Sequence, residues 1–144
     1  MTAMTAITTM STESEQGQMP IRSEADIVLA RQQVRRLTQQ LKFSLVDQTK
    51  MITAASELSR NTLIYGGGGD MLWQLVQNGL RQGLRLSFVD QGPGIADIDL
   101  ALKDGWTSGG GLGMGLSGSK RLVNDFELET APGQGTRVTI TRWK

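Results

Sequence analysis

The sequence predicts an α/β two-layer sandwich, in which helices cover one face of a mostly antiparallel sheet. Two segments with helical periodicity come first, and two pairs of short segments with strand-like alternation follow them. A third helical segment lies between those pairs. This order of helix, helix, hairpin, loop, helix and hairpin is typical of a sheet that is covered by helices on one side.

Two helices are expected in the first half of the chain. The first spans residues 24–42 after the N-cap candidate Ser23, and its apolar residues recur at helical spacing: Ile27, Ala30, Val34, Leu37 and Leu41. The second spans residues 48–65 after the cap candidate Asp47, and its expected buried residues are Met51, Ala55, Leu58 and Thr62. It is expected to end at the glycine run 66–69, where helix propensity collapses.

Two hairpins and a third helix are expected in the second half. The four strands are placed at residues 70–77, 83–90, 126–131 and 136–142. Asn78-Gly79 begins the turn of the first hairpin, and a Pro-Gly-Gln-Gly sequence at 132–135 forms the turn of the second. Between the hairpins, a glycine-rich loop at 91–114, with one helical turn near 97–103, leads into a helix. That helix is placed at 115–125, and its residues near one face are Leu116, Val123 and Phe126.

The composition limits the chemistry. The chain has 144 residues, a formal net charge of +1, no cysteine and no histidine. Without cysteine there is neither a disulfide nor a thiolate metal ligand. Without histidine there is no Ser-His-Asp triad, no histidine-ligated zinc and no phosphohistidine. Binding to nucleic acid is not expected, because the lysines and arginines are scattered rather than gathered into a basic field.

One domain is expected after a short tail. Residues 1–20 are rich in Thr, Ser, Met and Glu, and we predict that they form a disordered N-terminal tail. Residues 21–144 are predicted to form a single domain. No apolar run approaches the roughly 20 residues of a membrane helix, and the N-terminus lacks the basic and apolar stretches of a secretory signal. A cytoplasmic protein without membrane contact is therefore expected.

A carboxylate and an amide lie one turn apart in the second predicted helix. Residues i and i+4 share a helix face, so Glu57 and Asn61 lie together beside the buried stripe. A carboxylate can take a proton or orient a nucleophile, and an Asn oxygen can ligate Mg²⁺. The alternative is a solvated polar face, which is common on exposed helices.

A second carboxylate ends a predicted strand and begins a glycine turn that contains Gly92 and Gly94. Side chains alternate along a strand, so Asp90 shares a face with the apolar residues before it, which are Leu84, Leu86 and Phe88. A buried carboxylate needs a hydrogen-bond donor, and the amino group of a purine would supply one. The alternative is a simple strand-ending turn.

Two further glycine motifs follow. The first leads into the third helix and consists of Gly109, Gly110, Gly111, Leu112, Gly113, Met114, Gly115 and Leu116. Glycines let backbone N–H groups approach an anion, and a helix N-terminus adds its dipole, so this run has the form of a phosphate cradle. The alternative for this run is a flexible linker. For the second motif, Gly133-Gln134-Gly135-Thr136, a hairpin turn and a ligand contact are equal alternatives.

These four motifs occur in the order found in the GHKL (Bergerat-fold) ATP-binding superfamily, which the chain resembles over about residues 21–144. Within that superfamily the chain looks most like the small bacterial serine/threonine kinases of the RsbT type and the related anti-sigma factors. The stretches that carry the resemblance are residues 55–63, 90–95, 104–116 and 120–123. Each motif alone is a weak signal, whereas four in order at these spacings are specific.

The resemblance implies roles for the residues around the base and the metal. Asp90 would bind the adenine amino group of ATP or ADP, and Gly92 and Gly94 would shape the turn beneath the base. Asn61 would hold the Mg²⁺ that bridges the phosphates. Glu57 would act as general base or orient the acceptor hydroxyl.

The resemblance also implies how the phosphates are held. Residues 105–114 would form a short ATP lid, and the amides of residues 113–116 would cradle the phosphates. Gly135 and Thr136 would contact the nucleotide from the last hairpin.

Finally, the resemblance implies an activity. Members of the family phosphorylate Ser or Thr on STAS-domain antagonist proteins and so switch partners in a stress-response (stressosome-like) sigma-factor pathway. The expected partners are therefore STAS-domain proteins of the RsbS and RsbR kind, with a downstream phosphatase or cyclase-type effector. The alternative is an ATP-dependent anti-sigma-type binding module with little turnover, because the same motifs bind ATP in both.

Overall fold

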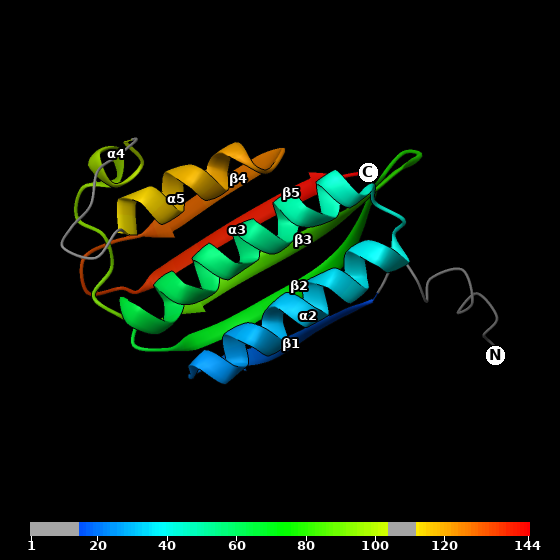
Figure 1. The fold of residues 1–144 in the computed structure, drawn as a ribbon. Helices are drawn as coiled ribbons and strands as arrows, with labels where there is room; N and C mark the ends of the chain where they lie inside the picture. The colour runs from blue at the N-terminus through cyan, green and yellow to red at the C-terminus, as the bar shows by residue number, and fades with distance from the viewer. Residues whose placement is uncertain (1–14, 104–111) are drawn as a thin grey trace, which may run out of the picture.

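The chain folds into two layers, one of helices and one of strands. The computed structural model describes residues 15–103 and 112–144, with side chains for 15–103 and 116–144. In chain order the described elements are β1 (Gln16–Ile21), α2 (Glu24–Gln40), α3 (Leu45–Ile64), β2 (Gly69–Asn78), β3 (Arg81–Asp90), α4 (Ile98–Ala101), α5 (Leu112–Arg121), β4 (Asp125–Thr130) and β5 (Thr136–Trp143). Figure 1 shows this arrangement.

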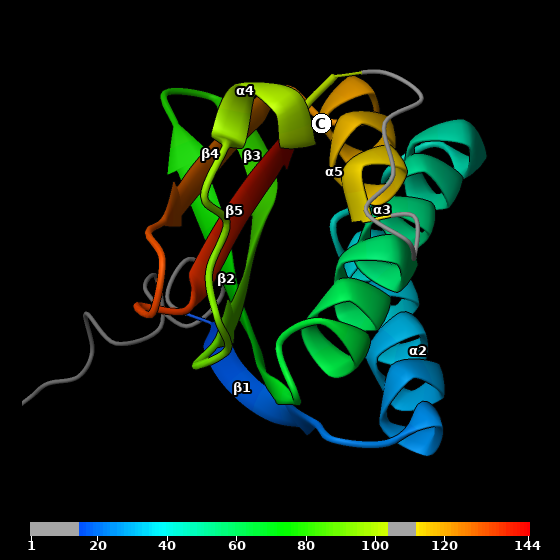
Figure 2. The same ribbon diagram turned by 90° about the vertical axis from the view of Figure 1, so that its left-hand side faces the viewer.

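The described strands form one sheet with the order β1-β2-β3-β5-β4. Every neighbouring pair is antiparallel. Helices α2, α3 and α5 lie on one side of the sheet, as Figure 2 shows. The predicted sandwich with helices on one face is therefore confirmed, and β3 lies at its centre between β2 and β5.

Apolar stripes of the helices and of β3 form the core. The five residues expected for the first helix are all buried, four of them in α2 and Leu41 at its C-cap, and so are the four expected residues of α3. Leu84, Leu86 and Phe88 meet them from the inner face of β3. Full burial of such a side chain stabilises the fold by about 1.5–3 kcal/mol, so this contact fixes α3 over the central strands.

Side-chain caps determine where α2 and α3 begin. The N–H of Asp26 donates to Ser23 Oγ at 3.2 Å, as the sequence predicts. At α3 the prediction is wrong, because the cap is Ser44 rather than Asp47. Ser44 Oγ accepts a hydrogen bond from the N–H of Asp47 at 3.1 Å, and α3 begins at Leu45.

Strand β1 corrects the prediction for the N-terminal segment. Residues 16–20 were assigned to the disordered tail, yet they form most of an edge strand that pairs with β2. Their polar composition concealed a strand alternation, in which Met19 and Ile21 face the helices and pack on the core. Residues 1–14 lie outside the described residues.

The third predicted helix is shifted toward the N-terminus. Helix α5 begins at Leu112 rather than at 115, and it ends at Arg121. Val123 therefore lies in the following turn, and Phe126 lies in β4, although both pack against the core. Packing of α5 on α3 outweighs the low helix propensity of its glycines. Helix α4 agrees with the expected helical turn near 97–103.

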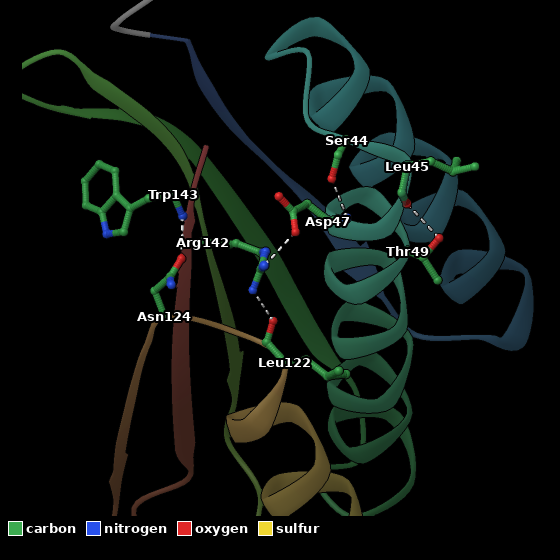
Figure 3. A network of polar contacts seen from close by, with 8 residues as sticks. All are labelled: Ser44, Leu45, Asp47, Thr49, Leu122, Asn124, Arg142 and Trp143. Atoms are coloured by element: carbon green, nitrogen blue, oxygen red, sulfur yellow. Dashed lines mark hydrogen bonds and ion pairs between the residues drawn. The ribbon is translucent and has the colours of Figure 1, made fainter.

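Arg142 joins three elements at one end of the molecule (Figure 3). Its guanidinium donates to Asp47 of α3 at 2.6 Å and to the Leu122 carbonyl, just after α5, at 2.9 Å. The Arg142 side chain is 15% exposed and that of Asp47 is 28% exposed. The hydrogen bond from Arg142 lowers the pKa of the Asp47 carboxyl. The network ties α3 and the end of α5 to the last strand.

Asp47→Ala is expected to lower the free energy of unfolding by about 1–2 kcal/mol, because the largely buried Arg142 would lose its charged partner. Glu129→Ala is the matched control, since it removes an ion pair to Arg137 between side chains that are 46% and 75% exposed. That control should change the free energy by about 0.5 kcal/mol or less. Urea unfolding of both variants makes the comparison, and equal losses would contradict the assigned role of Arg142.

The same pair predicts how stability depends on pH. A carboxyl whose pKa is lowered by folding stabilises the protein above its unfolded pKa of about 3.9, and this contribution is lost as the pH falls through the folded value. Asp47→Asn should therefore show a shallower loss of stability below about pH 4 than the unchanged protein. Parallel acid unfolding curves would argue against this.

Candidate functional site

A cavity of about 200 Å³ lies between the end of α3, the ends of β3 and β5, and α5. Its apolar lining consists of Leu58, Phe88, Pro93, Ile95, Leu116 and Val138. Its polar side chains are those of Asn61, Thr62, Tyr65, Asp90 and Thr136. Apolar walls with a few convergent polar groups are typical of a small-molecule site. Of the residues predicted from sequence, Asn61, Asp90, Gly94, Leu116 and Thr136 meet here.

Asp90 ends β3 and faces the cavity, as its position in the strand predicts. Its Oδ1 accepts a hydrogen bond from the N–H of Gly92 at 2.9 Å. Burial raises the pKa of the Asp90 carboxyl, and hydrogen bonds from the backbones of Gly92 and Thr136 only partly oppose that rise. The carboxylate thus has fewer donors than it would have in water, so a ligand donor in the cavity would stabilise it.

Gly66 and Gly92 make room for this carboxylate. A Cβ on Gly66 would overlap the Asp90 carboxyl group, and a Cβ on Gly92 would lie 2.8 Å from the Cα of Gly66. Sequence reasoning missed Gly66, because the run 66–69 was interpreted only as the end of a helix. Its place directly after the helix that carries Asn61 was the available signal.

The turn after β3 is braced by the turn between β4 and β5. The N–H of Ile95 donates to Thr130 Oγ1 at 2.9 Å, and the N–H of Gly133 donates to the Pro93 carbonyl at 2.7 Å. Gly94 has a φ of 76° and lies against the Ala131 carbonyl, so both its conformation and its space require glycine. This bracing fixes one wall of the cavity.

Two predicted glycines lie behind the cavity rather than in it. Gly92 packs beneath the Asp90 side chain, and Gly135 packs against the Asp90 carbonyl. Their contribution is to let the backbone approach Asp90 closely. Thr136, which follows Gly135, is the residue of that motif whose side chain reaches the cavity.

Helix α3 carries both of its predicted site residues, in different surroundings. Asn61 lines the cavity, and its buried Nδ2 has no hydrogen-bond partner among the described residues. An unpaired buried amide costs about 1–3 kcal/mol, which a ligand acceptor would offset. Glu57, one turn earlier, is exposed and lies outside the cavity lining. The structure therefore places a solvent-accessible carboxylate beside the cavity.

The glycine run is described only in part. Gly109, Gly110 and Gly111, with most of the expected lid, lie outside the described residues. Since the first N–H groups of a helix lack intrahelical acceptors, the start of α5 at Leu112 leaves the amides of residues 112–114 without such an acceptor, and the cradle expected from the amides of residues 113–116 stays a prediction. Leu116 instead contributes a buried side chain to the cavity.

The described residues were also compared with the requirements of a metal cluster and of a membrane-spanning helix. In the parts of the chain that the structure describes, no three His, Cys, Asp or Glu side chains gather as a metal site. None of the described helices has the length and apolar character of a membrane span.

Comparison with known proteins identifies the family of the chain. Residues 46–144 match the model of the histidine kinase-, DNA gyrase B- and HSP90-like ATPases. The chain belongs to this family. That result confirms the GHKL superfamily predicted from the four motifs.

Individual relatives agree with the family. The chain is 42% identical to the serine/threonine-protein kinase RsbT of Bacillus subtilis (strain 168) over 130 residues, which cover 90% of this chain and 98% of that one. It is 28% identical to the anti-sigma F factor of Thermoanaerobacter sp. (strain X514) over 120 residues, which cover 79% and 82% of the two chains. The family and the near full-length match to RsbT identify the chain as an ATP-dependent enzyme of the kinase type.

Two solved structures share the fold. The RsbU and RsbW domains of a Mycobacterium tuberculosis protein match with a TM-score of 0.63 and 16% identity, over 91% of this chain. This chain spans 33% of that longer one. A chain of the SiaB–SiaC complex from Pseudomonas aeruginosa matches with a TM-score of 0.53 and 10% identity. The match covers 96% of this chain and 96% of that one. At these identities the likeness concerns the fold alone.

Asp90→Asn is expected to weaken ATP binding by about tenfold or more, because an amide NH₂ would replace one of the carboxylate acceptors. Without nucleotide, the variant should be at least as stable as the unchanged protein at pH 7. The raised pKa means that ionised Asp90 opposes folding increasingly as the pH rises above its unfolded pKa of about 3.9, and Asn lacks that ionisation. Calorimetric titration and thermal unfolding measure the two effects, and unchanged ATP affinity would refute the assignment.

Gly66→Ala tests the room that this carboxylate needs. The φ of Gly66 is not positive, so alanine adds a clash with Asp90 without backbone strain. ATP affinity is expected to fall by about tenfold. Gly118→Ala in α5 is the control, because a Cβ there meets nothing within 4 Å, and its ATP affinity should stay unchanged. Equal affinities of the two variants would show that Gly66 has no such role.

Proposed function

We propose that the chain is a protein serine/threonine kinase that transfers the γ-phosphate of ATP to STAS-domain antagonist proteins. The transfer would switch partners in a bacterial stress-response, stressosome-like sigma-factor pathway. The observation that carries this proposal is the exposed Glu57 one helical turn from Asn61, at the edge of the cavity that contains Asp90. The identity to RsbT over nearly the whole of both chains supports it.

The cavity would hold the adenine of ATP. Asp90 would accept a hydrogen bond from the amino group of the base, which adds a donor to the half-buried carboxylate beside the backbone N–H groups that it already has. Apolar side chains, among them Ile95, Leu116 and Val138, would pack on the faces of the ring. The turn that contains Gly92 and Gly94 would shape the wall beneath the base.

The phosphates would extend from this cavity toward α5. Free amides at the start of α5, together with the preceding glycines 109–111, would donate to the phosphate oxygens. Asn61 fits a role as a Mg²⁺ ligand, because its amide oxygen is a hard donor and its buried Nδ2 is not held by a described partner. When bound there, Mg²⁺ would supply positive charge that offsets the charge of the phosphates.

Glu57 would handle the proton. As the hydroxyl oxygen of the substrate forms its bond to the γ-phosphorus, the bond from that phosphorus to the β-phosphate oxygen breaks and ADP leaves. The Glu57 carboxylate would accept the hydroxyl proton as general base or, in the alternative, orient the hydroxyl for attack. The exposure of Glu57 suits a substrate hydroxyl that lies on the surface of a partner protein.

The similarity to an anti-sigma F factor favours a second candidate, an ATP-dependent anti-sigma-type binding module with little turnover. Labelled ATP and a purified STAS-domain protein of the RsbS or RsbR kind separate the two. Covalent label on the partner supports the kinase, and stable co-elution without label supports the module. A downstream phosphatase or cyclase-type effector and a cytoplasmic location belong to the same proposal.

Glu57→Ala is expected to reduce phosphotransfer by at least about 10²-fold, because the proton acceptor is removed. ATP affinity should change less than about twofold, since Glu57 does not line the cavity. Glu24→Ala is the control, because it removes a carboxylate that is 69% exposed on α2 and should retain full transfer. Phosphotransfer at the unchanged rate in Glu57→Ala would refute the role of Glu57.

A further inference from the structure

Thr130 lies outside the cavity, yet its hydroxyl contacts the residues that form one wall of it. Thr130 is the last residue of β4 and is half-buried. Its Oγ1 accepts a hydrogen bond from the N–H of Ile95 at 2.9 Å and donates to the Gly135 carbonyl at 2.9 Å. The same oxygen lies 2.9 Å from Thr136 Oγ1. One hydroxyl therefore joins the turn after β3 to the start of β5.

These contacts determine which way the Thr136 hydroxyl points. A threonine hydroxyl has one proton and two lone pairs, and a carbonyl oxygen can only accept. Because the proton of Thr130 goes to Gly135, the bond between the two threonines must be donated by Thr136. The proton of Thr136 is thus directed at Thr130, and its lone pairs are left for the cavity.

Asp90 and Thr136 then present two acceptors on the same wall. They are directly opposite each other in the register of β3 and β5, and both line the cavity. Opposite residues on one face have Cβ atoms about 4.5–5.5 Å apart. An amino group carries two N–H bonds, so one such group can donate to both residues.

We propose that Thr130 is a positioning residue that sets the base specificity of the cavity, by holding Thr136 as an acceptor beside Asp90. A purine with an amino group at position 6 satisfies both acceptors. A purine with an oxo group at that position places its own lone pairs against them, and an unmatched polar contact in a site built for hydrogen bonds is costly. This inference rests on the proposed function, in which the cavity binds ATP.

The test compares ATP with inosine triphosphate, which has an oxo group in place of the amino group. Thr130→Val removes the acceptor for Thr136, whose proton can then turn toward the cavity and donate to the oxo group. The preference for ATP, measured as the ratio of the two dissociation constants, is expected to fall by about tenfold. In phosphotransfer the change should lie in KM rather than in kcat.

Two variants separate this role from a merely structural one. Thr130→Ser keeps the hydroxyl and should keep the full preference for ATP. Thr139→Val, in the same strand as Thr136, removes a threonine hydroxyl whose Oγ1 lies 3.1 Å from Ser87 Oγ on the outer face of the sheet, and it should keep the preference too. If Thr130→Val does not unfold cooperatively, Thr130→Cys replaces it, because a thiol is a weak donor and acceptor of similar size.

The outcomes distinguish this inference from the function on which it rests. Loss of preference in Thr130→Val or Thr130→Cys, with retention in Thr130→Ser and Thr139→Val, supports it. If the ratio of the two dissociation constants is unchanged in the folded Thr130→Val or Thr130→Cys variant, the inference is overturned. In that case, loss of ATP binding in Asp90→Asn would still support the proposed function. If the unchanged protein does not bind ATP, both fail.

Discussion

The close approach of α3 and β3 at one end of the molecule controls the rest of the site. Asp90 can end β3 beneath α3 only because Gly66 has no side chain there, and Gly92 and Gly135 give the same freedom on other sides. The carboxylate that results is half-buried, and burial raises its pKa against the opposing hydrogen bonds from the backbones of Gly92 and Thr136. A carboxylate in these surroundings gains stability from an added hydrogen-bond donor, which is why the proposed ligand role falls on Asp90.

The opposite end of α3 is fixed in a different way. There, Asp47 in the first turn of the helix binds Arg142. Arg142 also donates a hydrogen bond to the Leu122 carbonyl, just after α5. The helix is thus anchored by a charged pair at its start and by tight backbone packing at its end. Asn61 and Glu57 lie between these two anchors, on a helix whose stripe is buried against the sheet. Their positions therefore depend on one contact at the far end of the helix from the cavity and on one at the cavity itself.

Much of the fold and of the candidate site could be predicted from the sequence, because many of their determinants are local. The alternation along β3 predicts the side on which Asp90 lies, and the helical spacing in α3 predicts its buried stripe. Other features depend on residues distant in the chain. In the structure the Asp47 carboxylate binds Arg142, 95 positions later, and Ser44 rather than Asp47 caps the helix. Thr130 gains its role from Ile95, 35 positions earlier, and no local pattern marks that contact.

Strand β1 limits how far the chain can be shortened from its N-terminus. Its residues give the sheet an edge, and without them the unpaired backbone of β2 would be exposed as a template for association with other chains. A shortened protein should therefore retain residue 16. Because Gln16 pairs with Gln74 while Ile21 pairs with Gly69, the chain enters the sheet far from Gly66. A fusion partner or affinity tag joined directly before β1 would therefore attach at the end of the sheet away from the cavity that contains Asp90.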